Sequence, residues 1–315
     1  MKSGSGVSRS PTRIALERLR KDRVAMICVG IVVFYILIAI FAPLLAKLEG
    51  QDPIANHFEL VNRRTTFPFE GITADHWFGV EPRLGRDLFA RWVYGARPSL
   101  LVATAVTIVT TIIGVIVGLV AGFFGGWIDR IISWVIDFVL SLPYLIFAIA
   151  FPAVIISVVY GSTEGALPEE VARVRFISLI VVLSFFGWAG LARLIRGQVL
   201  SLREREFIAA SRVLGMPTRR VLFRELLPNL VAPIVVSASL ALPGYIVAEA
   251  GLTFLGVGLM EPTPSWGVTI AAARNYYDNY PIYLWVPVLG ITILVLALSL
   301  LGDAIRDAFD PKTRR

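Results

Sequence analysis

Six stretches of the chain carry few or no Asp, Glu, Lys or Arg side chains. They cover residues 24–46, 98–128, 131–163, 176–192, 226–260 and 279–302. A helix needs about 20 apolar residues to cross the hydrocarbon core of a bilayer. Five stretches meet this length readily, and the fourth lies near its lower limit. The pattern therefore predicts an all-α polytopic membrane protein with six transmembrane helices.

Basic residues outside these stretches predict the orientation. Seven lie in the N-tail 1–23, eight in the loop 193–228 and four in the C-tail 303–315. An even number of spans places these three segments on one side, and basic loops favour the cytoplasm. The N and C termini are therefore expected to be cytoplasmic. The organisation becomes a tail 1–23, a first span 24–46, an extracytoplasmic segment 47–97, a core 98–302 with five spans, and a tail 303–315.

Composition narrows the class of protein. Hydrophobic residues make up 56% of the 315 positions and charged residues 17%, whereas soluble domains carry about 25% charged residues. So much apolar surface also excludes a disordered chain. The single cysteine, Cys28, excludes a disulfide framework and a multi-cysteine metal site. The net charge of +7 follows from the basic cytoplasmic segments, so it does not indicate nucleic-acid binding.

No catalytic constellation is visible in the sequence. None of the four lysines lies in a G-x-x-x-x-G-K-[ST] phosphate loop. The two histidines, His57 and His76, lack metal-ligand spacing to a further ligand. The chain is therefore predicted to be no enzyme, and to hold no cofactor or metal of its own.

Two acidic residues interrupt the apolar stretches. Asp137 lies in the third and Glu249 in the fifth. A charge at the bilayer centre costs about 2.5–3.5 kcal/mol on insertion scales, so each side chain is expected to face protein or water. Asp137 is expected to pair near a helix end with Arg130 or a neighbour. Glu249 is left open between a structural hydrogen bond and a place on a transport pathway.

Small residues and prolines mark two of the spans. Gly114, Gly118 and Gly122 repeat every four residues along the second span, a spacing that lets helix backbones approach closely. This predicts packing within the chain or against a partner. Pro143 and Pro152 interrupt the third span, where a backbone break needs protein or water around it.

The loop 193–228 has the pattern of a folded helix–turn–helix. Ser201 and Glu204 fit a capping box at a helix N-terminus. Apolar residues then follow at i, i+3 and i+7: Phe207, Ala210 and Leu214. Gly215 suits a left-handed C-terminal turn, Pro217 stops the helix, and a second helical piece is expected over 218–227. Such a loop favours docking to a soluble partner, with a helix lying on anionic headgroups as the alternative.

Residues 205–215 read REFIAASRVLG, and Leu227-Pro228 follows twelve positions later. This stretch resembles the EAA loop of binding-protein-dependent ABC import permeases, which reads E-A-A, three residues, G, and then L-P. Gly215 and Leu227-Pro228 match the motif. Ala209 stands at the glutamate position, followed by Ala210 and Ser211, so a role for that glutamate does not carry over.

Other segments resemble one subfamily of these permeases, which transports dipeptides, oligopeptides or nickel. They are HWFG at 76–79, LGRDLFAR at 84–91, YGAR at 94–97, EAGLTFLG at 249–256, PTPSWG at 262–267 and the tail from 301 to 311. Their order is similar to that of the "C" permease subunit of dipeptide and oligopeptide systems. The resemblance covers roughly residues 12–312.

The resemblance implies a type I ABC importer permease (MetI-like) fold in the bacterial cytoplasmic, or inner, membrane. It implies a homologous permease as heterodimer partner, two cytoplasmic ATPase subunits that bind ATP and Mg²⁺, and an extracytoplasmic solute-binding protein. Membrane lipid surrounds the complex, and no nucleic acid is involved. Di- or oligopeptides are the expected cargo, with nickel or another small solute as the alternative.

The resemblance also assigns residues to the ATPase-coupling loop. They are Glu206, Phe207, Ala209, Ala210, Ser211, Leu214, Gly215, Met216, Leu227 and Pro228. Two other classes of protein fit these residues less well. A stand-alone secondary transporter needs a coupling-ion site, and two isolated acids make a poor one. A membrane enzyme or scaffold lacks support because no reactive constellation is visible.

Overall fold

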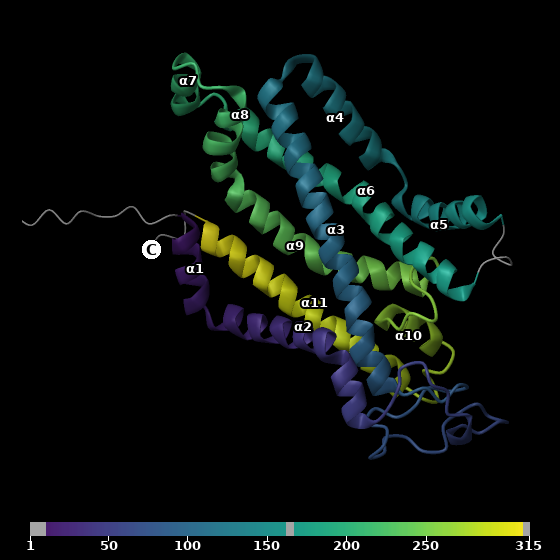
Figure 1. The fold of residues 1–315 in the computed structure, drawn as a ribbon. Coiled ribbons are helices and arrows are strands. Elements are labelled where there is room, and N and C mark those ends of the chain that lie inside the picture. Colours follow the sequence, from purple (N-terminus) through teal and green to yellow (C-terminus); the bar gives the residue numbers. More distant parts are fainter. Residues whose placement is uncertain (1–10, 162–166, 311–315) are drawn as a thin grey trace, which may run out of the picture.

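A computed structural model describes residues 11–161 and 167–310, and in these ranges the protein is all-α (Figure 1). No β-strand forms in this part of the chain. The helices are α1 (Pro11–Lys21), α2 (Arg23–Glu49), a short 3₁₀ turn (Phe58–Leu60), α3 (Leu88–Phe124), α4 (Gly126–Ser141), α5 (Tyr144–Tyr160), α6 (Pro168–Leu202), α7 (Glu206–Val213), α8 (Thr218–Arg220), a π-helical turn (Val221–Leu226), α9 (Leu227–Phe254), α10 (Trp266–Ala273) and α11 (Ile282–Phe309).

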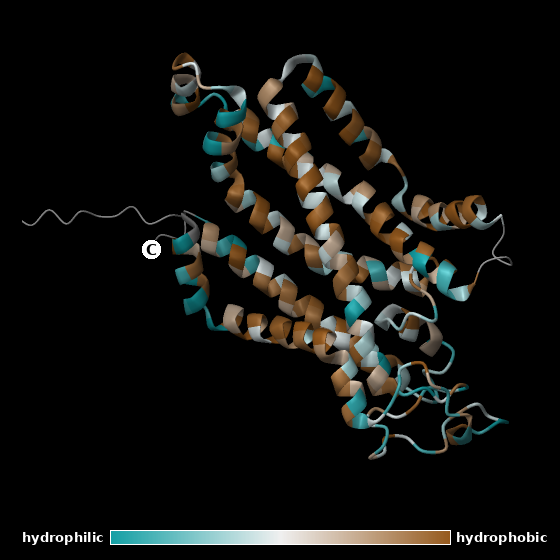
Figure 2. Cartoon of the chain, viewed as in Figure 1, coloured by the Kyte–Doolittle hydropathy of each residue, from teal (hydrophilic) through white to brown (hydrophobic). Residues whose placement is uncertain are grey.

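Five helical segments are long and apolar enough to cross a membrane. They are α2, α3, α6, α11 and the continuous run Thr218–Phe254. The pair α4 and α5 passes the same test together but is bent by 86°, which makes up to six spans. Figure 2 shows hydrophobic residues along these helices, with hydrophilic residues gathered at α1, at the loops and in the segment 50–87. The all-α membrane architecture expected from the sequence is thus present.

The third predicted span is not one straight helix. α4 ends at Ser141, and Leu142 is extended at φ −71° and ψ 138°. A residue before proline is pushed out of the helical region by the proline ring, and here that proline is Pro143. The chain therefore turns before α5 begins. Pro152, in contrast, lies inside α5 without ending it.

Several helices extend beyond the apolar stretches that predicted them. α6 runs for 35 residues from Pro168, whereas the uncharged stretch covers only 176–192. α3 begins at Leu88, where Asp87 caps it by accepting a 2.6 Å hydrogen bond from the backbone N of Ala90. Charged residues mark where a helix leaves the hydrocarbon, but they do not end the helix. Span lengths read from charge alone are therefore too short.

The glycine repeat of the second predicted span packs α3 against α6. A Cβ atom at Gly118 would lie 2.7 Å from the carbonyl oxygen of Ala192, and one at Gly122 would lie 2.7 Å from Cβ of Val199. Real side chains do not approach this closely, so glycine sets the distance between the two helices. Of the two kinds of packing expected, the structure shows packing within the chain.

The two ends of the bundle differ in character. α1, α7 and the end of α11 lie at one end, and the mostly irregular segment 50–87 lies at the other (Figure 1). α9 and α3 connect these ends directly. The loop between α6 and α9 is consequently far from the long segment that follows α2.

Candidate functional site

α7 starts later than the sequence predicts. Ser201 lies inside α6, which continues to Leu202, so the predicted capping box does not form. α7 instead begins at Glu206, and the amides of Ile208 and Ala209 bond to the carbonyl oxygen of Arg205 at 3.0 and 3.2 Å. Val199, near the end of α6, is fully buried in one cluster with Ile208. This packing favours a helix that continues past Ser201.

The buried face of α7 is formed by Ile208 and Ser211. Ile208 is fully buried and packs in one cluster with Ile195, Val221 and Leu226. Ser211 is buried as well, and its hydroxyl donates a 2.9 Å hydrogen bond to the carbonyl oxygen of Phe207. The stripe of Phe207, Ala210 and Leu214 faces outward instead. Ile208 is the residue that fixes α7 to the bundle.

The end of α7 exposes two large apolar side chains. Val213 is 88% exposed and Leu214 is 82% exposed. Gly215 follows at φ +73°, as expected for a left-handed helix end, and nothing lies within 4 Å of where its Cβ would be. The amide of Met216 closes the turn on the carbonyl oxygen of Ser211 at 3.0 Å. The loop therefore ends in an open apolar tip formed by Val213 and Leu214.

The chain returns from this tip as one continuous helical run. Pro217 precedes α8, the π-helical turn follows, and Leu227 and Pro228 begin α9 without a break. Val221 and Leu226 bury against Ile208 and α6. All ten residues assigned to the coupling loop thus lie on one projection whose base joins α6 to α9, and Glu206, Ala209 and Ala210 are exposed on it.

Asp137 pairs with a different helix from the one expected. Its carboxylate forms an ion pair with Arg193 of α6, not with Arg130 on its own helix. About two turns earlier on α4, Asp129 pairs with Arg196, whose Nη2 lies 2.8 Å from Oδ2 of the acid. Two acids of α4 therefore tie it to two arginines of α6. In this arrangement Asp137 has a structural partner.

Glu249 is fully buried between two helices. Its Oε2 accepts a 2.7 Å hydrogen bond from the hydroxyl of Ser99 on α3, and its Oε1 accepts a 3.1 Å bond from the hydroxyl of Thr253. A buried polar group with partners on both oxygens stabilises the contact between α3 and α9. Of the two roles left open, this geometry supports the structural one.

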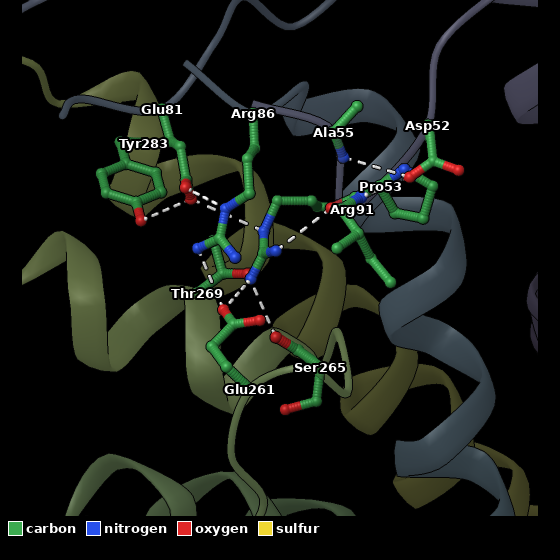
Figure 3. A network of polar contacts seen from close by, with 11 residues as sticks. Asp52, Pro53, Ala55, Glu81, Arg86, Arg91, Glu261, Ser265, Thr269 and Tyr283 are labelled. Carbon is green, nitrogen blue, oxygen red and sulfur yellow. Dashed lines mark hydrogen bonds and ion pairs between the residues drawn. The ribbon is translucent and has the colours of Figure 1, made fainter. Parts of the chain in front are cut away.

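A buried ion network at the opposite end was not found from the sequence (Figure 3). Arg91 of α3 is 1% exposed, and its Nη2 lies 2.6 Å from Oε1 of Glu261 in the loop after α9. Arg86 pairs with Glu81 and lies 3.0 Å from Glu261. The hydroxyl of Tyr283 on α11 donates a 3.0 Å hydrogen bond to Glu81. The network thus fixes the segment 50–87 to α3, to α11 and to the loop after α9.

The charges in this network decide the ionisation of Glu261. Burial alone would raise the pKa of its carboxyl group, but Arg91 and Arg86 outweigh burial and hold that pKa below its usual value. The only sequence signal for this network was that the segment 47–97 carries seven basic and seven acidic residues. It did not identify the partners, because Glu261 lies 170 positions from Arg91.

Family models match most of the chain. The model described as "Binding-protein-dependent transport system inner membrane component" matches residues 114–315. The chain belongs to this family. A second model, "N-terminal TM domain of oligopeptide transport permease C", matches residues 10–60. The protein is accordingly a permease subunit of an ABC importer and a multi-pass protein of the bacterial inner membrane. Permeases of this family are non-catalytic and work with ATPase and substrate-binding partners.

Curated relatives align over nearly the full length. The dipeptide transport system permease protein DppC of Alkalihalophilus pseudofirmus is 38% identical, over 97% of this chain and 91% of the relative. The oligopeptide transport system permease protein OppC of Bacillus subtilis is 33% identical, over 96% and 90%. The glutathione transport system permease protein GsiD of Salmonella typhimurium is 36% identical, over 97% and 92%.

A solved structure supports the fold of this permease. The inward-facing MetNI methionine ABC transporter has a chain that is 20% identical, with a TM-score of 0.52, over 71% of this permease and 98% of that chain. At this identity the likeness concerns the fold alone. The MetI-like fold implied by the sequence resemblance is confirmed.

Proposed function

We propose that this permease carries di- or oligopeptides into the cell as half of a permease heterodimer. Relatives named for dipeptide, oligopeptide and glutathione transport are 33–38% identical to it over nearly their full length. All three cargoes are short peptides. Nickel, or another small solute, is the alternative cargo for this subfamily.

In this proposal two cytoplasmic ATPase subunits bind ATP and Mg²⁺, and an extracytoplasmic solute-binding protein delivers the peptide. The N-tail, the loop 193–228 and the C-tail face the cytoplasm, in keeping with their basic residues. In this proposal the chain itself binds no cofactor. Its part is to form one wall of the pathway and to transmit movement from the ATPase.

The exposed tip of α7 carries the coupling proposal. Val213 and Leu214 are large apolar side chains at the most exposed end of a projecting loop. Exposed apolar groups gathered at one place mark protein contacts. We infer that the tip, with Gly215 and Met216, enters a cleft on one ATPase subunit.

The base of the loop supplies the transmission. Ile208 packs against Val221 and Leu226, and the same cluster includes Ile195 and Val199 of α6. Packed cores shift between discrete arrangements and do not deform continuously. Movement of the tip on ATP-driven closure therefore shifts α6 and α9 as a unit and switches access between the two sides of the membrane.

The coupling proposal is tested by charging the tip. The chain is expressed with its neighbouring transport genes, and the complex is purified through a tag on this chain. Leu214→Asp is expected to lose the ATPase subunits. Ile72→Asp is the control, because it makes the same kind of change at a side chain of the segment 50–87 that is 64% exposed, and it is expected to keep them. Full ATPase retention by Leu214→Asp would reject the coupling role.

Cargo is tested separately in proteoliposomes that contain the whole complex and its solute-binding protein. Labelled dipeptide, labelled tetrapeptide and ⁶³Ni²⁺ are offered in turn, with ATP inside. Peptide uptake that needs both ATP and the binding protein is the expected result. ATP-dependent uptake of nickel without peptide uptake would replace the peptide proposal by the alternative.

A further inference from the structure

An apolar groove runs between α3 and α9 near the coupling loop. Its volume is about 400 Å³. Every side chain on its walls except that of Thr111 is hydrophobic, and the walls include Ile112, Ile116 and Leu119 of α3 and Ile234 of α9. Ile112 and Ile116 are more than half exposed, so no other part of the described chain fills the groove.

A basic cavity continues the groove toward the end of the bundle. It has a volume of about 590 Å³ and is lined by Pro217, Arg219, Arg220, Phe223 and Arg224. Phe223 belongs to both linings, which makes the two spaces neighbours with one shared wall. All three arginines are exposed, and within residues 11–161 and 167–310 none of them forms an ion pair.

The groove extends into the bilayer along α3, whereas the three arginines lie at the membrane surface. Thr111 lies 13 residues before Phe124, the last residue of α3. At about 1.5 Å per residue, the groove reaches roughly 20 Å below the end of that helix. The arginines precede the apolar run that begins at Leu227, so they lie at the surface. An apolar groove inside the bilayer, continued by a basic cavity at the membrane surface, fits an amphiphile with an anionic headgroup.

We propose that this groove and cavity bind one anionic phospholipid. An acyl chain lies along Ile112 and Ile116, and the phosphate lies among Arg219, Arg220 and Arg224. Guanidinium groups bind phosphate through paired N–H donors, and basic pockets between transmembrane helices select anionic headgroups. Phe223 stands where the acyl chain meets the head.

The charge pattern favours a lipid over the protein partners. A cytoplasmic ATPase can reach the arginines but cannot follow the groove to the depth of Ile112, because that part lies inside the bilayer. A second permease can reach the groove, but it can pair with the arginines only if it carries acidic side chains at the same level of the membrane. One lipid molecule satisfies both halves of the site.

The site also adjoins the base of the coupling loop. Val221 and Leu226 of the same π-helical turn as Phe223 are fully buried against Ile208. A lipid on the outer face of this turn therefore braces the element that joins the tip to α9. Anionic lipid is thus expected to influence coupling as well as to occupy space.

The test measures retained lipid on the full-length chain, so it does not depend on the proposed transport partners. The chain is purified in mild detergent with equimolar phosphatidylglycerol and phosphatidylcholine, and native mass spectrometry counts the lipid that stays bound. The charge variant replaces Arg219, Arg220 and Arg224 by Gln. Its control replaces Arg63, Arg64 and Arg83, three exposed arginines of the segment 50–87, by Gln.

A second pair of variants tests the groove without altering charge. Ile116→Trp fills the groove, and Ile108→Trp adds the same bulk at an exposed position of α3 outside its lining. Wild type is expected to retain one phosphatidylglycerol in preference to phosphatidylcholine. Both site variants are expected to reduce that retention about tenfold, and both controls are expected to leave it within twofold.

Three outcomes would overturn the proposal. Equal retention of phosphatidylglycerol by the charge variant and its control would show that the three arginines do not bind the headgroup. Equal retention of the two lipids by wild type would leave only general solvation by membrane lipid. Loss of a co-expressed second permease by Ile116→Trp, with phosphatidylglycerol retention unchanged, would assign the groove to the permease interface instead.

Discussion

Arg91 Nη2 lies 2.6 Å from Glu261 Oε1, although 170 positions of sequence separate the two residues. Arg91 is almost fully buried, so its guanidinium group needs protein partners such as Glu261. Through this pair the start of α3 is fixed to the loop after α9. The segment 50–87 is in turn fixed to both through Glu81 and Arg86.

Arg91→Met is expected to destabilise the end of the bundle that holds the segment 50–87. Removing one partner of a buried ion network leaves an uncompensated charge, which costs about 3–5 kcal/mol. Limited proteolysis should then cut within 50–87 at least tenfold faster than in wild type. The control is Arg97→Met, because Arg97 is exposed and lies over the ring of Tyr94 without an ion pair in the described ranges. Wild-type protection in Arg91→Met would show that the network carries no stability.

Acid should loosen the same segment. Because Arg91 and Arg86 lower the pKa of Glu261 in the folded protein, its contribution to stability is fully present above the usual pKa of Glu, about 4.3. That contribution is lost as the pH falls through the lowered value. Proteolytic protection of 50–87 in wild type should therefore fall with pH below about 4.3. Glu261→Gln should lose protection at neutral pH and show a smaller further loss in acid.

Gly215 should matter through its backbone conformation alone. Its φ is +73°, and its Cβ position is empty. Gly215→Pro fixes φ near −65° and cannot form this turn, whereas Gly215→Asn tolerates a left-handed turn. Peptide-stimulated ATP hydrolysis by the reconstituted complex should fall at least tenfold with proline and stay within threefold with asparagine. Equal activity of the two variants would mean that the turn is unimportant for coupling.

The spans were predictable because the bilayer imposes a single requirement, namely about 20 apolar residues per crossing. The apolar stretches therefore located α2, α3, α6, α9 and α11 correctly. Pro143 marked the place where the third predicted span is interrupted, but the sequence did not predict the 86° bend there. A proline weakens a helix locally, but the packing of α4 on α6 and of α5 on α6 decides how far the chain turns.

The coupling loop was predictable in outline but not in its faces. Gly215 marked its turn because few residues other than glycine adopt a positive φ. The sequence placed Phe207, Ala210 and Leu214 on one apolar stripe, but it did not show that α7 is buried through Ile208 instead. Ile208 packs in a cluster with Ile195, Val221 and Leu226, and those contacts come from α6 and from the chain after the turn.

Substitutions in the glycine repeat should separate α3 from α6. Gly118→Ala places a Cβ 2.7 Å from a backbone oxygen of α6, and overpacking of this kind costs about 1–3 kcal/mol. The apparent Tm of the purified chain should therefore fall. Gly30→Ala is the matched control, because nothing lies within 4 Å of its Cβ position on α2. It should leave Tm unchanged or raise it, since alanine is the better helix former.

Asp137→Asn distinguishes an ATP-driven permease from an ion-coupled carrier. Asp137 is the more exposed of the two intramembrane acids and pairs with Arg193, itself more than half exposed. Exposed ion pairs contribute about 0–1 kcal/mol, so ATP-driven uptake by the whole complex should stay within threefold of wild type. Arg193→Gln should behave similarly. An ion-coupled carrier that used Asp137 as its ion site would instead lose uptake entirely in Asp137→Asn, and it would transport without the ATPase subunits. Either result would show that this carboxylate is not purely structural.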